Sequence, residues 1–307
     1  MMRRVKTCLV LATLAGISCG CVTKTGVTGH TKLTPSQIPV AKDTTREELL
    51  EAYNLIARGT KTLNATVELK PTAGSKYSGV IDEYHEVKAF LLAARPEEIR
   101  IIGQAPVIGT TVFDMASDGD TFQVSIPSKK KFLVGAVAFE HAGSKPIENL
   151  RPQHLLDALL WPEIRKEEAV TLKEFNDESA RYYILTVLRG GYQLEVLREI
   201  WFDRADLQVT RMLTFGPKGV LLSDVHLADW QPADFAAGQS APTTPSNGLA
   251  SFPRAIRIER PHDDYKLDLQ VTKVSVNEEI PAERFKLEQP AGAELVRVGE
   301  ATENKQP

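Results

Sequence analysis

The chain has 307 residues, of which 42% are hydrophobic and 25% charged, and this composition is typical of a globular protein with one large β domain or two small ones. Its net charge is −3, so it lacks the basic field that attracts nucleic acid, and no nucleic-acid partner is expected. No run of about 18 apolar residues follows the first 20 residues, so no transmembrane helix is predicted.

The first residues have the order of a secretory signal peptide: basic, then apolar, then small. The apolar run, residues 8–17, is about ten residues long, which is too short to span a bilayer as a helix. Residues 1–20 are therefore predicted to be a signal peptide, with Cys8 as an apolar member of it. The basic residues that precede the run are Arg3, Arg4 and Lys6.

The small residues end in cysteine, where an ordinary signal peptide would end in a residue such as alanine. The segment Ser18-Cys19-Gly20-Cys21 resembles the lipobox of bacterial lipoproteins. In that family the cysteine thiol receives diacylglycerol, the preceding peptide is cut, and the new amine is often acylated, for example with palmitate. The resemblance implies lipidation of Cys21, with Cys19 as the alternative. Two or more acyl chains make a stable anchor, at about 0.8 kcal/mol per buried CH₂.

The residues after Cys21 bear on location. Val22 and Thr23 follow it, and in the best-known sorting rule an aspartate at this place retains a lipoprotein in the inner membrane. The resemblance therefore implies the outer membrane, with the body in the periplasm. Residues 21–43 are rich in Thr, Lys, Gly and Pro and are predicted to be a flexible tether. No cysteine follows Cys21, so no disulfide can form in the body.

A helix is predicted next, ending near Gly59 as a possible C′ glycine. Thr44 or Thr45 is placed to cap it, and Thr45 with Glu48 fits a capping box. Its apolar stripe at helical spacing consists of Leu49, Leu50, Tyr53, Ile56 and Ala57.

Alternating and apolar runs then predict a series of strands, at residues 63–70, 80–92, 99–102, 111–116, 121–126 and 132–134. Asp118-Gly119 predicts a tight hairpin. A second helix is predicted from Pro152, which suits a first turn, to Trp161 before Pro162. Its apolar face consists of Leu155, Leu156, Leu159 and Leu160.

The second half reads as hairpins, with strands at residues 182–188, 192–202, 207–215 and 220–230. Residues 236–250 are predicted to be a disordered loop and residues 291–307 a polar, frayed tail. From Tyr265 to Val271 the apolar residues occupy odd-numbered positions, whereas Val274 and Val276 occupy even-numbered positions. This slip predicts a β-bulge near Thr272-Lys273.

The order of these elements, together with three local motifs, resembles the lipoprotein-localisation family of periplasmic carriers and outer-membrane receptors. The motifs are residues 95–100 (RPEEIR), residues 200–203 (IWFD) with 207–211 (LQVTR), and residues 276–281 (VNEEIP) with 285–287 (FKL). The resemblance covers residues 44–290 and implies a mainly β (α+β) domain. This would be an unclosed, strongly curved antiparallel β-barrel, with the N-terminal helix and the inserted helix as a lid over a hydrophobic cavity for acyl chains.

Two departures from the family matter. The soluble carriers have no acyl anchor, so Cys21 favours a receptor-like or resident role. The receptor's exposed apolar insertion loop has no clear counterpart, because the one large insertion, residues 236–250, is small and polar. The family has no catalytic residues, and none is expected here.

The sequence offers little support for catalysis. The six histidines are scattered, without an HExxH motif or a cysteine partner, and no nucleophile-elbow or nucleotide-binding glycine pattern occurs. His262-Asp263-Asp264 is the nearest approach to a metal cluster, and residues 82–86 (DEYHE) to a carboxylate–histidine site. A solvated turn and a wet strand face explain them better. Two interpretations of Lys129-Lys130-Lys131 remain open: a contact with anionic lipid, and a solvated turn. Three tryptophans are expected in the core: Trp161, Trp201 and Trp230.

These features predict a non-enzymatic lipoprotein without metal or cofactor. It would bind lipid or the acyl chains of lipoproteins in a half-barrel cavity. The alternative is a structural or accessory subunit of an outer-membrane complex, with a filled core and no ligand. An enzyme is the third hypothesis, and it would require clustered carboxylates with a histidine in one deep pocket.

Overall fold

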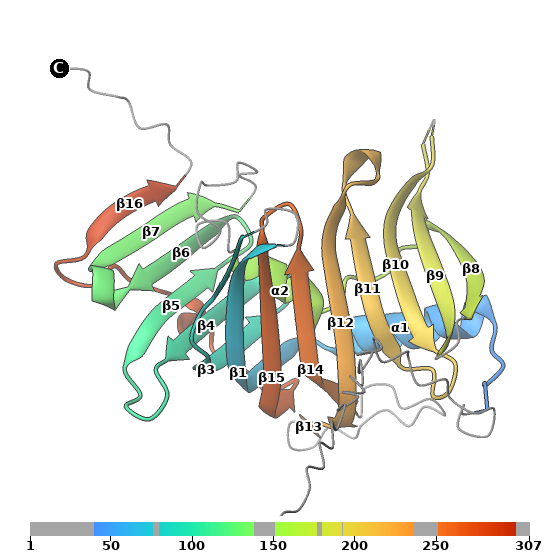
Figure 1. The fold of residues 1–307 in the computed structure, drawn as a ribbon, viewed down its shortest axis with the longest axis horizontal. Coiled ribbons are helices and arrows are strands. Elements are labelled where there is room, and N and C mark those ends of the chain that lie inside the picture. Colours follow the sequence, from blue (N-terminus) through green and yellow to red (C-terminus); the bar gives the residue numbers. More distant parts are fainter. Residues whose placement is uncertain are drawn as a thin grey trace, which may run out of the picture.

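The structure is a computed structural model, and it describes residues 40–75, 80–137, 151–176, 180–191, 193–235 and 251–298. One large sheet dominates it (Figure 1). The helices are α1 (Arg46–Gly59) and α2 (Pro152–Leu159). The strands are β1 (Thr62–Ser75), β2 (Val80–Glu83), β3 (Val87–Ala94), β4 (Glu98–Gln104), β5 (Thr111–Ser117), β6 (Thr121–Ile126), β7 (Lys131–Ala136), β8 (Ala169–Asn176), β9 (Arg181–Arg189), β10 (Glu195–Asp203), β11 (Val209–Phe215), β12 (Leu221–Pro232), β13 (Asp234–Phe235), β14 (Ser251–Arg260), β15 (Tyr265–Val276) and β16 (Glu294–Val298).

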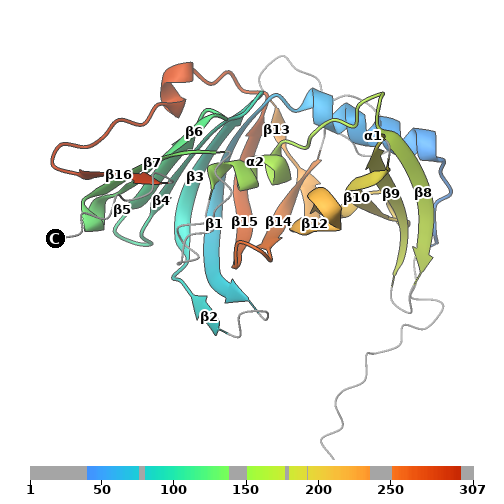
Figure 2. The same cartoon turned by 90° about the horizontal axis from the view of Figure 1, so that it is seen from above.

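The sheet is a curved, open half-barrel. Its strand order is β16-β7-β6-β5-β4-β3-β1-β15-β14-β12-β11-β10-β9-β8, with β2 paired to β1 and β13 to β15 outside this path. The path ends in β16 at one side and β8 at the other, and the view from above shows the sheet bent into an arc, with α2 inside the arc and α1 along its β8–β10 end (Figure 2). The predicted fold class is confirmed.

The pairing of β1 with β15 joins the two halves of the chain. Leu63 lies opposite Val276 and Leu69 opposite Leu269, so residues about 200 positions apart share the middle of the sheet. The predicted bulge is confirmed, because Thr66 pairs with Lys273 while Val67 pairs with Val271, which leaves Thr272 as the extra residue. The hydroxyl of Thr272 donates to the Thr66 carbonyl at 3.0 Å.

The capping box that begins α1 is confirmed. The Glu48 amide donates to Thr45 Oγ1 at 3.2 Å, and the Thr45 amide donates to Glu48 Oε2 at 2.9 Å. The other end differs from the prediction: Gly59 is the last helical residue, and the extended Thr60 ends the helix in place of a left-handed C′ glycine.

The predicted long strand at residues 80–92 is wrong. It is two strands, because residues 84–86 lie opposite only two residues of β1: β1 pairs Leu69 with Val87 and Thr72 with Glu83. The proline at position 71 of β1 has no amide hydrogen to donate there. Its carbonyl instead accepts the Tyr84 amide at 3.1 Å.

The predicted tail beyond Pro290 is also wrong as far as Val298. β16 pairs in parallel with β7, with Val296 opposite Leu133. The segment before it crosses the sheet on the face away from α2, where Phe285 packs on Leu92 and Ala94. Two strands, β8 and β13, were not predicted at all. The predicted loop at residues 236–250 lies outside the described residues.

Candidate functional site

The concave face of the sheet is apolar and continuous across its strands. Along β1, Leu63, Ala65, Val67 and Leu69 are buried at alternate positions, as a strand with one covered face requires. Neighbouring strands continue the surface with Leu267, Leu269, Ile256, Ile258, Val225, Leu227, Met212, Ile200, Phe202, Leu185 and Val187. Together with side chains of both helices these form a single buried cluster.

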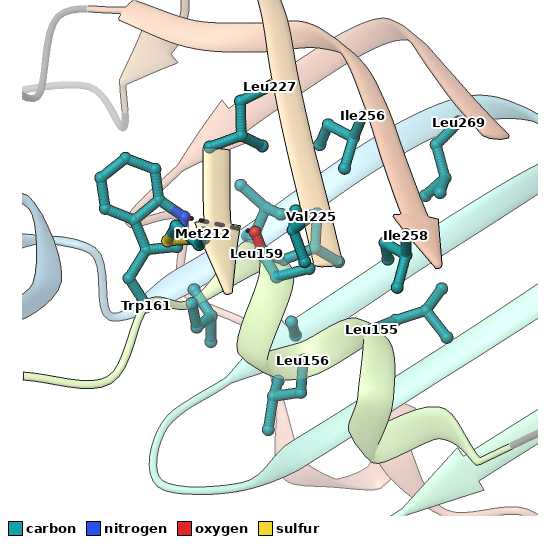
Figure 3. Close-up of a cluster of buried hydrophobic side chains, with 14 of the residues drawn as sticks. Leu155, Leu156, Leu159, Trp161, Met212, Val225, Leu227, Ile256, Ile258 and Leu269 are labelled. Atoms are coloured by element: carbon teal, nitrogen blue, oxygen red, sulfur yellow. Dashed lines mark hydrogen bonds between the residues drawn. The ribbon is translucent and has the colours of Figure 1, made fainter. Parts of the chain in front are cut away.

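The helix α2 covers the centre of this face. Its predicted apolar face is confirmed, because Leu155, Leu156 and Leu159 are each less than 5% exposed. Figure 3 shows them in one buried cluster with Met212, Val225, Leu227, Ile256, Ile258 and Leu269 of the sheet. In the described structure the concave surface is therefore occupied by the protein's own helix.

Trp161 closes the end of α2. Its ring stacks on Tyr53 of α1 at a centroid distance of 5.4 Å and meets Trp230 edge-on at 6.0 Å. Its indole N–H donates to the Ala158 carbonyl at 3.2 Å (Figure 3). Burial raises the pKa of Tyr53 to about 12, and its hydroxyl donates to the Pro162 carbonyl at 3.0 Å.

One arginine ties both helices to the sheet. Arg95, in the turn between β3 and β4, donates to the carbonyls of Ala57 (2.7 Å) and Thr60 (2.9 Å) at the end of α1. The same guanidinium donates to the Trp161 carbonyl beyond α2 at 2.7 Å. Partial burial lowers the pKa of this guanidinium, which still carries its charge. Arg95 thus satisfies three backbone carbonyls at the junction of three elements.

A paired amide joins α1 to the segment after α2. The buried Asn54 donates through Nδ2 to the Ile164 carbonyl at 3.0 Å and accepts the Ile164 amide at 2.9 Å. The side-chain amide thus exchanges two hydrogen bonds with one residue, as paired residues of neighbouring strands do. It fixes the chain that follows α2 against α1.

The first turn of α2 is held by polar groups. Gln153 Nε2 donates to the Glu97 carbonyl at 2.9 Å. The next residue, His154, bonds through Nδ1 to the Tyr265 hydroxyl and through Nε2 to Arg260 at 3.2 Å. In the sequence His154 is one of six scattered histidines, because its partners lie more than 100 positions away.

The other predicted candidate residues do not form a site. In the turn 262–264 the carboxylate of Asp263 accepts a bond from Arg260 at 2.7 Å. No group of three or more His, Cys, Asp or Glu side chains within the described ranges is placed to hold a metal. Lys130, between β6 and β7, has a left-handed backbone (φ 50°), as a turn residue does. Asp82, Tyr84, His85 and Glu86 are exposed at the break between β2 and β3.

The tryptophan prediction holds for Trp161 and fails for Trp201. Trp201 lies on the face opposite the main core, since its neighbours Ile200 and Phe202 point inward and are buried. There it contacts Phe175 and Tyr182 at centroid distances of 5.6 and 5.5 Å. The half-buried Trp230 packs against the core.

The hairpin between β4 and β5 has an exposed apolar tip, which was not predicted. Between β4 and β5 the chain turns through Pro106-Val107-Ile108-Gly109, where Val107 is fully exposed and Ile108 is 75% exposed. Val107 also has a left-handed backbone (φ 72°), which is unfavourable for a β-branched residue. The chain therefore has an exposed apolar loop after all. The sequence signal for this exposed loop is the pair of apolar residues between Pro106 and Gly109.

The predicted lipidation residues, Cys21 and Cys19, lie outside the described residues, as does most of the predicted tether. Within the part of the chain that is described, neither helix is long and apolar enough to cross a membrane.

Three solved structures resemble this one to different degrees. A DUF1329 family protein from Desulfovibrio piger matches with a TM-score of 0.50 and 12% identity, over 80% of this chain and 98% of that chain. A LolA superfamily protein from Nitrosomonas europaea matches with a TM-score of 0.47 and 12% identity, over 80% and 99% of the two chains. A putative outer membrane lipoprotein-sorting protein domain from Vibrio parahaemolyticus matches with a TM-score of 0.47 and 11% identity, over 78% and 97%.

No protein-family model matches the sequence, and neither does any curated protein. At 12% identity the likeness to the DUF1329 family protein is one of fold alone.

Proposed function

We propose that this protein is an outer-membrane lipoprotein that binds an acyl chain of a lipid or lipoprotein on the concave face of its half-barrel. The observation that carries the proposal is the apolar concave surface beneath α2, which is contacted by one short helix inserted between strands. An acyl chain would take the place of α2 on this surface. The body would face the periplasm, anchored through lipidated Cys21, with Cys19 as the alternative.

Covering the concave face with α2 and covering it with an acyl chain involve free energies of similar size. Four α2-side residues, Leu155, Leu156, Leu159 and Trp161, are buried against the sheet and core. At about 1.5–3 kcal/mol each, their burial is offset by an acyl chain of roughly 8 to 15 methylenes, at about 0.8 kcal/mol per methylene. A lipid chain of ordinary length can therefore displace the helix without a large net change in free energy.

The first test is the lipid content of the protein. The membrane-extracted protein and a soluble form lacking residues 1–21 would both be analysed by native mass spectrometry and by organic extraction. The proposal expects one non-covalent acyl lipid per chain in both forms. Neither form carrying lipid, even after incubation with excess phospholipid, would contradict it.

A specific observation favours a second candidate function, that of an accessory subunit without a ligand. Both helices are held tightly on the concave face by Arg95, Asn54 and Tyr53, so the core is filled in the described structure. In that case a partner should co-purify in fixed stoichiometry, and added lipid should leave α2 in place.

The hairpin tip gives a further prediction. In the form lacking residues 1–21, replacing Ile108 with aspartate should weaken binding to phospholipid vesicles roughly tenfold. The reason is that burying one large apolar side chain in the bilayer contributes about 1.5 kcal/mol or more. Co-sedimentation with vesicles measures this.

The matched control for the tip is Leu194→Asp, at the hairpin between β9 and β10, since Leu194 is 65% exposed. Its vesicle binding should be unchanged. Equal losses of vesicle binding in the two variants would indicate a general effect of charge. No loss of binding for Ile108→Asp would show that the tip does not contribute to membrane contact.

A further inference from the structure

The protonation state of one histidine on α2 follows from its partners. Arg260 Nη2 lies 3.2 Å from His154 Nε2, and a guanidinium can only donate hydrogen bonds. His154 Nε2 must therefore accept, which places the single ring proton on Nδ1. That proton is donated to the hydroxyl oxygen of Tyr265. The contact requires a neutral imidazole in one tautomer.

We propose that His154 is a pH-sensitive latch that holds α2 over the concave face when it is neutral and releases the first turns of α2 when it is protonated. A second ring proton, on Nε2, would point at the Arg260 guanidinium, replacing a hydrogen bond with a contact between two cations. The inference goes beyond the proposed function, since it concerns the movement of the helix whatever ligand follows it.

The surroundings of His154 disfavour its cationic form from several elements. Arg260 of β14 and the buried Arg151, which precedes α2, are both positive and near the ring. Tyr265 of β15 is buried, and its raised pKa keeps the phenol neutral. His154 is also the third residue of α2, where the helix dipole is unfavourable to a cation.

Two carboxyl groups near α2 must also be considered. Asp263, in the turn between β14 and β15, is paired with Arg260 at 2.7 Å and so does not neutralise His154. Asp157 of α2 has a solvent-accessible side chain, but the protein packed around its carboxyl desolvates it and raises its pKa. Glu97, in the β3–β4 turn, adds to that rise, and Arg260 opposes it. Because Asp157 takes up a proton more readily in the closed state, acid strengthens closure through this group and opposes the effect of His154.

The direction of the effect on His154 can now be assigned. Desolvation first, and then the two arginines, hold the pKa of His154 well below its ordinary value of 6.5. When α2 lifts, the imidazole returns toward that ordinary value, so the open state binds the proton more readily. Closure is therefore fully stable above about pH 6.5 and weakens by up to tenfold per pH unit below it, since a single proton is taken up on opening.

The test is hydrogen exchange of the full-length protein in detergent micelles at pH 7.5, 6.5 and 5.5, corrected for the intrinsic pH dependence of exchange. Protection of the α2 amides should fall by up to about fivefold between pH 6.5 and 5.5, and by up to about tenfold between pH 7.5 and 5.5. Protection of α1 should stay constant over the same range.

Two variants separate the groups. His154→Gln keeps an acceptor for Arg260 and a donor for Tyr265 but cannot be charged, so its α2 protection should not fall with pH. Asp157→Asn removes the opposing group, so its α2 protection should fall at least as steeply as in the natural chain. The proposal is overturned if α2 protection is independent of pH, if His154→Gln shows the same decline, or if α1 and α2 lose protection together, as in global acid unfolding.

Discussion

Replacing Cys21 with serine is expected to abolish the proposed acylation of the chain and, with it, the proposed anchoring in the outer membrane. Serine has no thiol to receive diacylglycerol, and each lost acyl methylene removes about 0.8 kcal/mol of membrane affinity. Density-gradient separation of the membranes, with mass spectrometry of the N-terminal tryptic peptide, measures both effects.

Cys19→Ser is the matched control, two positions away in the same segment. It should be acylated and localised normally. The reverse pattern would assign lipidation to Cys19, and a natural chain with neither cysteine modified would remove the anchor from the account.

Replacing Arg95 with methionine is expected to lower the free energy of unfolding by about 4 kcal/mol, because hydrogen bonds to a charged group contribute about 1.5–3 kcal/mol each and act here through one shared guanidinium. Three backbone carbonyls, of Ala57, Thr60 and Trp161, would lose their donor. Chemical denaturation measures the loss. Faster exchange of the α2 amides should accompany it.

Arg58→Met is the control for charge and length. Arg58 contacts Glu163 at 3.2 Å, but both side chains are largely exposed, so less than about 1 kcal/mol should be lost. If the two variants are equally stable, Arg95 is not the tie between the helices and the sheet.

Local signals made much of the fold predictable. The capping box needed only Thr45 and Glu48, which are three positions apart, and the helix formed where they place it. The bulge at Thr272 followed from a change of phase within one strand. The inner face of α2 followed from leucines at helical spacing.

The misses involve partners distant in sequence. The break at residues 84–86 depends on Pro71 in the neighbouring strand, and β16 becomes a strand by pairing with β7 about 160 positions earlier. A similar limit applies to the site. Arg95 was noted only within the motif at residues 95–100, and His154 only as a scattered histidine, because their partners come together only when the sheet bends.

The ties on α2 fit a lid that opens under control. Its apolar face supplies most of the closing free energy, while Arg95 and His154 hold its two ends. If an acyl chain replaces the apolar contribution, as proposed above, the polar ties would decide when the exchange occurs. Breaking one end should therefore favour lipid uptake without removing the surface that binds it.

The central claim is that acyl chains bind where α2 now lies. Photo-cross-linking of the protein with a diazirine-bearing fatty acid, followed by peptide mapping, tests it most directly. The account predicts adducts on concave-face residues such as Met212, Leu227 and Ile258, reduced by unlabelled fatty acid. Adducts confined to Val107 and Ile108 at the hairpin tip, or spread over the surface without competition, would contradict it.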